Sequence, residues 1–178
     1  MRRESGSVVF SKAELLAFGG FVSRDVFRPR LNCIQFNVGH VLTTDGHRLL
    51  VYECPELVDK GMVHWESLAR AVAFMRKGEE LRLTLRKVRP VAMVGKTVFP
   101  LSYETGDTVP YKQVIPEKGN FARHCFNPRL LESLSLVAKS LGMLTTRVTL
   151  EGSSELGPLL FSFPGHPKWS AVVMGCRE

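Results

Sequence analysis

The sequence contains no apolar run that approaches the roughly 20 residues needed to cross a bilayer. The N-terminal segment MRRESGSVVF also lacks the uninterrupted apolar stretch of a secretory signal. A hydrophobic content of 44% and a mean hydropathy of +0.01 are instead typical of a soluble globular protein. We therefore expect a cytoplasmic protein, and its 178 residues are enough to bury a substantial core.

Cysteine is scarce, and its spacing excludes the usual zinc motifs. The four cysteines are Cys33, Cys54, Cys125 and Cys176, and no two of them form a CxxC pair. We interpret them as reduced thiols, mostly buried as small hydrophobic side chains. The sequence thus predicts neither a bound metal nor a cofactor.

Catalytic motifs are missing as well. The chain has no nucleophile elbow, no recognisable pair of carboxylates and no cluster of metal ligands. His124 beside Cys125, and Asp45 near His47, are the pairs that could most readily combine a nucleophile with a base. Adjacent residues on a strand point to opposite faces, which argues against the first pair. We expect a protein that is not an enzyme.

Acidic residues are outnumbered by basic ones. The 24 Lys and Arg against 17 Asp and Glu give a net charge of +7 and a pI near 9.5. This balance favours a polyanionic partner through long-range attraction and counterion release. Charge alone is equally compatible with a soluble protein that happens to be basic, so the partner has to be inferred from other features.

What the sequence does contain is a weak internal repeat. A short apolar strand, an amphipathic helix and several β-rich segments recur three times, about 60 residues apart, with no long linker between them. This pattern predicts an α+β fold of three βαβββ units, in which each helix lays one apolar side on a sheet. We place two units at 7–56 and 57–116, which together form one complete domain over 1–116, and a third unit at 117–178.

Each unit carries one helix signal. Ser11 and Glu14 have the spacing of a capping box before an apolar stretch. Gly78 can end a second helix, and Asn127, followed by proline, is a good N-cap for a third helix that Gly142 stops. The predicted helices cover 11–22, 64–77 and 127–141.

Strands are predicted where β-branched and aromatic residues alternate between turn signals. Asp45-Gly46 has the composition of a tight hairpin turn, and a proline-containing connector, TVPYKQVIPEKGN, separates the second and third units. The predicted strands cover 31–38, 40–44 and 47–52 in the first unit, 80–87, 91–94 and 96–102 in the second, and 145–150, 159–163 and 170–176 in the third.

Three segments carry motifs that can be recognised. They are RPRLNCIQFNVGHVLTTDGHRLLVYE at 28–53, VPYKQVIP at 109–116, and AVVMGCR at 171–177. In this order they resemble three motifs of the bacterial β sliding clamp of DNA polymerase III. The first is its Arg-Pro-x-Leu-Asn-Gly strand with an Ala-Thr-Asp-Gly-His-Arg-Leu hairpin. The others are its Phe-Pro-Asp-Tyr-x-x-Val-Ile-Pro connector and its Tyr-Val-Val-Met-Pro-Met-Arg end. The connector here lacks the family's Asp between Pro110 and Tyr111.

This resemblance implies a shortened clamp. The first two units are similar to the family's middle domain, and residues from about Asn120 onward to the second half of its last domain. The family's first domain and one further half have no counterpart. The implied fold is the DNA-clamp, or processivity, fold, with helices lining a ring and sheets on the outside.

In that family, client proteins insert a short peptide into a hydrophobic cleft between the middle and last domains. Such a cleft of aliphatic side chains can bury the apolar residues of a clamp-binding peptide. Carried over motif by motif, it comprises Leu31, Thr44, Gly46, His47, Arg48, Leu49, Pro110, Gln113, Val114, Val172 and Met174.

The family's ring contains twelve such units, so three units per chain imply a homotetramer, with a closed dimer as the alternative. A ring of this kind would encircle duplex DNA without reading its sequence, be opened by a clamp loader, and associate with the nucleoid. A truncated clamp that binds a host clamp or its client peptides, without encircling DNA, is the competing interpretation. Basic residues on or near the helices that could face DNA are Arg24, Arg70, Arg76, Lys77, Arg123, Arg129 and Lys139.

Overall fold

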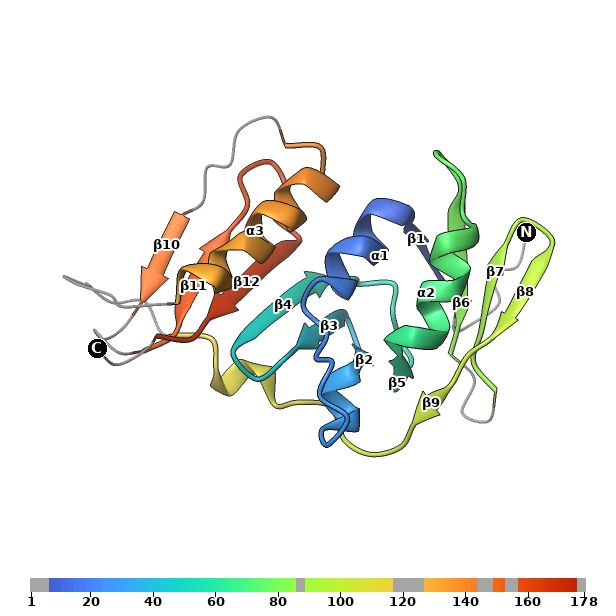
Figure 1. Cartoon of the computed structure of the whole chain (residues 1–178), viewed down its shortest axis with the longest axis horizontal. Helices are drawn as coiled ribbons and strands as arrows, with labels where there is room; N and C mark the ends of the chain where they lie inside the picture. Colours follow the sequence, from blue (N-terminus) through green and yellow to red (C-terminus); the bar gives the residue numbers. More distant parts are fainter. Residues whose placement is uncertain (1–6, 86–88, 117–126, 144–148, 153–156, 176–178) are drawn as a thin grey trace.

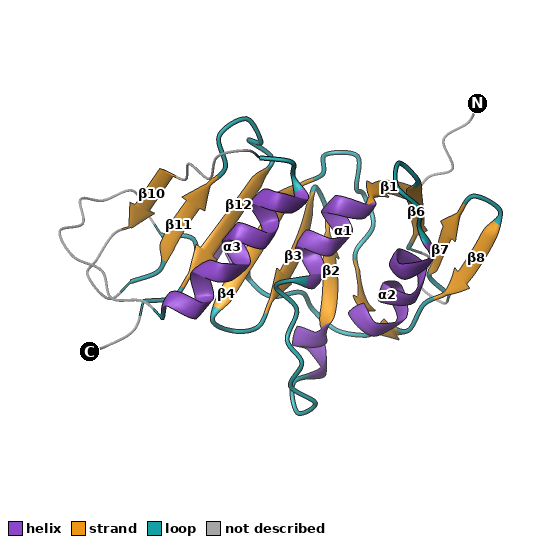
Figure 2. Cartoon of the chain, turned by 45° about the horizontal axis from the view of Figure 1, so that its top comes forward, coloured by secondary structure: helices purple, strands orange, loops and turns teal. Residues whose placement is uncertain are grey.

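A computed structural model describes residues 7–85, 89–116, 127–143, 149–152 and 157–175. These residues form two antiparallel sheets with the α-helices gathered on one side of them (Figure 2). The first unit contains β1 (Ser7–Ser11), α1 (Lys12–Gly19), the 3-10 helix η1 (Pro29–Asn32), β2 (Cys33–Asn37), β3 (His40–Thr44) and β4 (Arg48–Glu53). The second contains β5 (Gly61–His64), α2 (Trp65–Phe74), β6 (Glu80–Thr84), β7 (Val91–Val94), β8 (Thr97–Pro100), β9 (Tyr103–Glu104) and the 3-10 helix η2 (Tyr111–Gln113). The third contains α3 (Pro128–Ser140), β10 (Thr149–Gly152), β11 (Leu159–Ser162) and β12 (Trp169–Val173).

The first two units interlock by exchanging their opening strands. β1 of the first unit pairs with β6 of the second, and β5 of the second pairs with β2 of the first. One result is a four-stranded sheet in the order β1-β6-β7-β8. Neither unit completes its sheets from its own described strands alone.

The third unit joins the first through its last strand (Figure 1). β12 runs antiparallel to β4, with Val172 opposite Leu49 and Val173 opposite Arg48. The larger sheet therefore has eight strands, in the order β10-β11-β12-β4-β3-β2-β5-β9. The strand expected to open the third unit precedes α3 and falls outside the described residues.

An aromatic cluster ties the first and third units together beneath the helices. Phe18 of α1 stacks on Trp169 of β12, with ring centroids 5.1 Å apart. Trp169 in turn lies 4.6 Å from the ring of Tyr52 on β4, and all three side chains are buried. Burying a large apolar side chain contributes about 1.5–3 kcal/mol, and a favourable ring pair about 0.5–1.5 kcal/mol more. This cluster is therefore a principal hydrophobic tie between the two units.

The three predicted helices are present, but the first two end earlier than predicted. α1 stops at Gly19 instead of residue 22, because Phe21 leaves the helix to enter the core. α2 stops at Phe74 instead of residue 77, because Met75 adopts an extended backbone and buries its side chain. α3 starts as predicted, with the Asn127 side chain accepting the Arg129 N–H at 3.0 Å. No helix in the described part of the chain is long and apolar enough to span a bilayer.

Several strands are also shorter than predicted. The strand expected over 31–38 starts at Cys33, because η1 occupies the preceding residues with Pro29 at its start. The strand expected over 80–87 ends at Thr84, and that over 170–176 is shifted to Trp169–Val173. The predicted strand at 145–150 is described only from Thr149, since 144–148 lie outside the described residues.

Candidate functional site

The residues from the three recognisable segments surround a single groove. It has a volume of about 180 Å³ and lies where the β3–β4 hairpin, the connector and the end of β12 meet. Of the eleven residues predicted from the sequence, nine line it, whereas Pro110 and Gln113 are exposed nearby and do not. Val109 is a lining residue that the sequence did not predict. The groove consists of Leu31, Thr44, Gly46, His47, Arg48, Leu49, Val109, Val114, Val172 and Met174.

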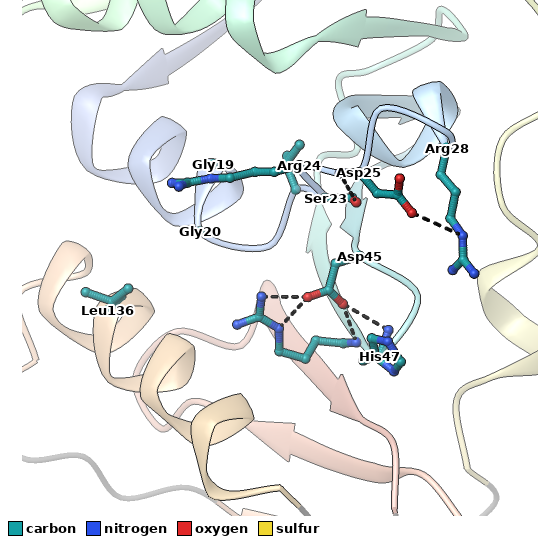
Figure 3. Close-up of a pocket in the computed structure, with 11 residues that line it drawn as sticks. Gly19, Gly20, Ser23, Arg24, Asp25, Arg28, Asp45, His47 and Leu136 are labelled. Atoms are coloured by element: carbon teal, nitrogen blue, oxygen red, sulfur yellow. Dashed lines mark hydrogen bonds and ion pairs between the residues drawn. The ribbon is translucent and has the colours of Figure 1, made fainter.

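The hairpin turn that borders the groove is held in one shape by Asp45. Its Oδ1 accepts the backbone N–H groups of His47 and Arg48, both at 2.9 Å. Its Oδ2 accepts from the Arg48 guanidinium at 2.6 and 2.9 Å, as Figure 3 shows. Gly46 has a φ of +91°, a conformation that side chains with a Cβ rarely adopt. The carboxylate is thus committed to the turn, which argues against the catalytic role considered for Asp45 with His47.

The floor of the groove is a second hydrophobic cluster on the sheet face opposite the helices. Alternation along β4 directs Leu50 and Tyr52 to the helix side, and Leu49 and Val51 to the other side. There they pack with Leu42, Tyr111 and Val172, and with the half-buried Val114, Ile115 and Leu160. The groove is therefore predominantly apolar and faces away from the helices.

The connector that forms one wall of the groove is fixed to the sheet by Gln35. This side chain has no exposed surface. Its Oε1 accepts the Val109 N–H at 2.8 Å, and its Nε2 donates to the Arg30 carbonyl at 3.4 Å. Because Val109 and Leu31, which follows Arg30, both line the groove, a single buried amide connects two of its walls.

The C-terminal wall is joined to the hairpin by the backbone. The Met174 N–H, just beyond β12, donates to the His47 carbonyl at 3.0 Å. The Met174 side chain is 37% exposed and lines the groove. The hairpin and the C-terminal strand are thus brought together as the sequence predicted.

A second, more polar hollow of about 570 Å³ adjoins the groove at the hairpin turn. Figure 3 shows the residues that line it. It lies between the end of α1, the following loop, the turn and α3, which contributes Leu136. His47 and Arg48 line both cavities. We call this second cavity the polar hollow; its lining is Gly19, Gly20, Val22, Ser23, Arg24, Asp25, Arg28, Asp45, His47, Arg48 and Leu136.

The basic residues predicted to face DNA lie largely on the helix side of the molecule. Arg70 is on α2, and Arg129 and Lys139 are at the two ends of α3. The other described members are Arg24, in the loop after α1, and Arg76 and Lys77, which follow α2; Arg123 falls outside the described residues. All six described side chains are exposed. Their contact with DNA remains a prediction.

The described titratable groups do not form a reactive centre. Burial raises the pKa of the Cys33 and Cys54 thiols to about 12, so both should stay protonated and unreactive at neutral pH. Cys125, Cys176 and His124 lie outside the described residues. Within the described ranges, no three His, Cys, Asp or Glu side chains are grouped to hold a metal ion.

His64 has a partner that the sequence did not predict. Its Nε2 lies 3.3 Å from the Glu104 carboxylate, which β9 brings alongside β5. His40 stands against the Tyr111 ring at 5.2 Å, at the edge of the connector. Both contacts have structural explanations and neither adds to a catalytic arrangement.

Comparisons with known proteins support the fold. No protein-family model matches the chain, and no curated protein sequence matches it. Among solved structures, the DNA polymerase sliding clamp of Pseudomonas aeruginosa superposes with a TM-score of 0.68 at 16% identity, covering 100% of this chain and 68% of that one. The DNA polymerase III subunit beta of Bartonella birtlesii superposes with a TM-score of 0.71 at 15% identity, covering 100% of this chain and 68% of that one. The DNA polymerase III subunit beta of Borrelia burgdorferi superposes with a TM-score of 0.76 at 12% identity, covering 99% of this chain and 66% of that one.

The predicted resemblance is thereby confirmed at the level of the fold. The matches cover 99–100% of this chain and 66–68% of each clamp, so the chain spans about two thirds of their length. The chain has the α+β fold of the bacterial DNA polymerase III β sliding clamps.

Proposed function

We propose that this protein is a non-enzymatic sliding clamp that encircles duplex DNA and holds polymerases and other clamp-binding proteins by their peptide motifs. The observation that carries the proposal is the groove, because nine residues from three distant segments converge on it as the clamp resemblance requires. The sliding-clamp fold supports the same conclusion.

The groove suits an extended peptide with apolar side chains. Leu31, Leu49, Val109, Val114 and Val172 supply aliphatic surface, and Met174 an adaptable thioether. Two buried peptide side chains would contribute about 1.5–3 kcal/mol each, less the cost of ordering the peptide. We therefore expect micromolar affinity for a single site, strengthened by avidity when several sites share one ring.

Ring formation is proposed from the number of units and from an edge strand. Three helices lie on one side of the sheets, as required of subunits whose helices line a hole. β8 is the last strand of the four-stranded sheet in the described part of the chain, and such an edge can pair with another chain. Four chains would supply twelve units, so we propose a homotetramer, with a closed dimer as the alternative.

DNA binding is proposed to be topological and independent of sequence. The net charge of +7 and the six exposed basic residues described above favour phosphate contacts on the helix side. A clamp loader would open the ring around DNA.

Native mass and DNA retention test this proposal together. Four chains of 19.9 kDa should give an assembly of about 80 kDa by native mass spectrometry. Loaded on circular DNA with a clamp loader, the protein should remain bound through washes and be released when the circle is cut. A persistent monomer that binds clamp motifs but is never retained would instead favour a decoy that captures client peptides.

A further inference from the structure

We propose that the polar hollow is an acidic-residue subsite, which binds a Glu or Asp side chain in the segment flanking the peptide held in the groove. This inference rests on the proposed peptide-binding function and adds a preference for clients with an acidic flank. The hollow has a size typical of ligand sites, at about 570 Å³.

The two cavities are positioned to take consecutive parts of one peptide. His47 and Arg48 line both of them, so the hairpin turn is a ridge between the cavities. Asp45 holds that ridge by four hydrogen bonds, two to backbone N–H groups and two to the Arg48 guanidinium. An extended peptide advances about 3.3 Å per residue, so a few flanking residues suffice to cross a turn of this size.

The charges of the hollow favour an acidic side chain. Its two carboxylates are already engaged, since Asp45 binds Arg48 and the turn, and Asp25 accepts the Phe27 N–H at 2.9 Å. Arg24 has no ion-pair partner among the described residues. Arg28 has only a 3.7 Å contact with Asp25, and its side chain is 59% exposed. Arg24 and Arg28 extend to opposite sides of the hollow (Figure 3), so each guanidinium group would pair with a different carboxylate of an acidic flank.

The hollow also has an apolar wall for the stem of such a side chain. Leu136 of α3 is 50% exposed and faces the cavity from the side opposite Arg28 (Figure 3). Methylene groups of a glutamate could pack on Leu136 while the carboxylate reaches Arg24.

Three peptides with one clamp-motif core test the subsite. Glu-Glu, Gln-Gln or Lys-Lys would flank the core, on its N-terminal side in one set and on its C-terminal side in another. Fluorescence anisotropy at low salt should show one Glu-flanked peptide binding about 3- to 10-fold more tightly than its Gln counterpart, the range expected for one or two exposed ion pairs. The advantage should shrink at high salt.

The double variant Arg24→Gln/Arg28→Gln should abolish this advantage and leave the affinity of the Gln-flanked peptide unchanged. Arg82→Gln is the matched control, because it also removes an exposed arginine, but from β6, and Arg82 lines neither cavity. The control should preserve the preference for the Glu flank.

Two results would overturn the subsite. One is equal affinity for all three flanks in the unaltered protein, and the other is a preference that survives the double variant. If the double variant keeps the preference but loses retention on circular DNA, the two arginines serve DNA instead. If none of the peptides binds, the groove is not a client site, and this result is distinguishable from failure of the subsite alone.

Discussion

Gln35 is a strand residue that faces the second hydrophobic cluster, and its amide side chain has no exposed surface. Its neighbour across the β2–β3 ladder is Leu42, a member of that cluster. A buried amide is costly unless it is hydrogen-bonded, and here both polar atoms of the side chain have backbone partners. The hydrogen bonds that Gln35 makes to the connector and to the η1 segment therefore explain why a polar residue occupies this buried position.

Replacing Gln35 by leucine should weaken peptide binding more than it weakens the fold. The Val109 N–H would lose its 2.8 Å partner, so the connector wall would no longer be preformed. A net hydrogen bond is worth about 1 kcal/mol, which corresponds to roughly a 5-fold increase in the peptide Kd. The buried leucine should offset part of the loss in stability and keep the melting temperature within a few degrees.

Gln113→Leu is the matched control for this substitution. Gln113 lies on the same connector but is exposed and does not line the groove. Calorimetric titration should therefore give an unchanged Kd for Gln113→Leu. An equal loss of affinity in both variants would contradict the positioning role of Gln35.

Two residues carried over to the groove by motif matching lie outside its lining. Pro110 and Gln113 were carried over by position in a connector that is one residue shorter than the family's. The structure instead presents Val109, whose place is set by Gln35, 74 residues away in sequence. A contact of that separation leaves no periodic signal, whereas local features such as the Ser11–Glu14 capping box were predicted and are present.

Among the elements, β12 and the β3–β4 hairpin matter most because they form the groove together. The hairpin could be predicted from Asp45 and Gly46, since turn chemistry is local. The pairing of β12 with β4 could not, because nothing in the period of either strand specifies its neighbour. Only the resemblance of separate motifs to one family placed these elements side by side.

Introducing charge at the end of β12 should abolish peptide binding and spare the fold. In Met174→Glu, a carboxylate would stand against the apolar groove and lose its hydration when a peptide binds. Because the thioether contact is lost as well, we expect the peptide Kd to increase 10- to 100-fold, which corresponds to a loss of about 1.4–2.8 kcal/mol in binding free energy. Fluorescence anisotropy with a clamp-motif peptide measures the change.

Val58→Glu provides the control for this experiment. Val58 is 59% exposed and lines neither cavity, so it accepts the same charge on the surface. Both variants should keep the native mass of the unaltered protein. If Met174→Glu bound the peptide as tightly as Val58→Glu does, the client site would lie elsewhere.

For the whole molecule, the exposed side of β8 offers a route to assembly. A two-residue turn joins β7 to β8, and Val94 pairs with Thr97 across it. Because hydrogen-bonded and non-bonded pairs alternate in an antiparallel ladder, the next residue, Val98, turns its backbone N–H and C=O away from β7. Pro100, two residues further, has no N–H to present on that side. Val98 is therefore the edge position where a neighbouring chain could gain main-chain hydrogen bonds.

Val98→Pro should break the assembly and leave the subunit folded. Proline removes only the outward N–H of Val98, so the pairing with Met93 on β7 should survive. If β8 joins the chains of the ring, light scattering after size exclusion should show a shift from about 80 kDa toward the 19.9 kDa monomer, with circular dichroism unchanged. Val98→Thr keeps the N–H and the β-branched shape, and should remain tetrameric. If Val98→Pro remains tetrameric, the subunit contact lies on another edge. If its circular dichroism signal is lost, β8 is needed for the fold of the subunit itself.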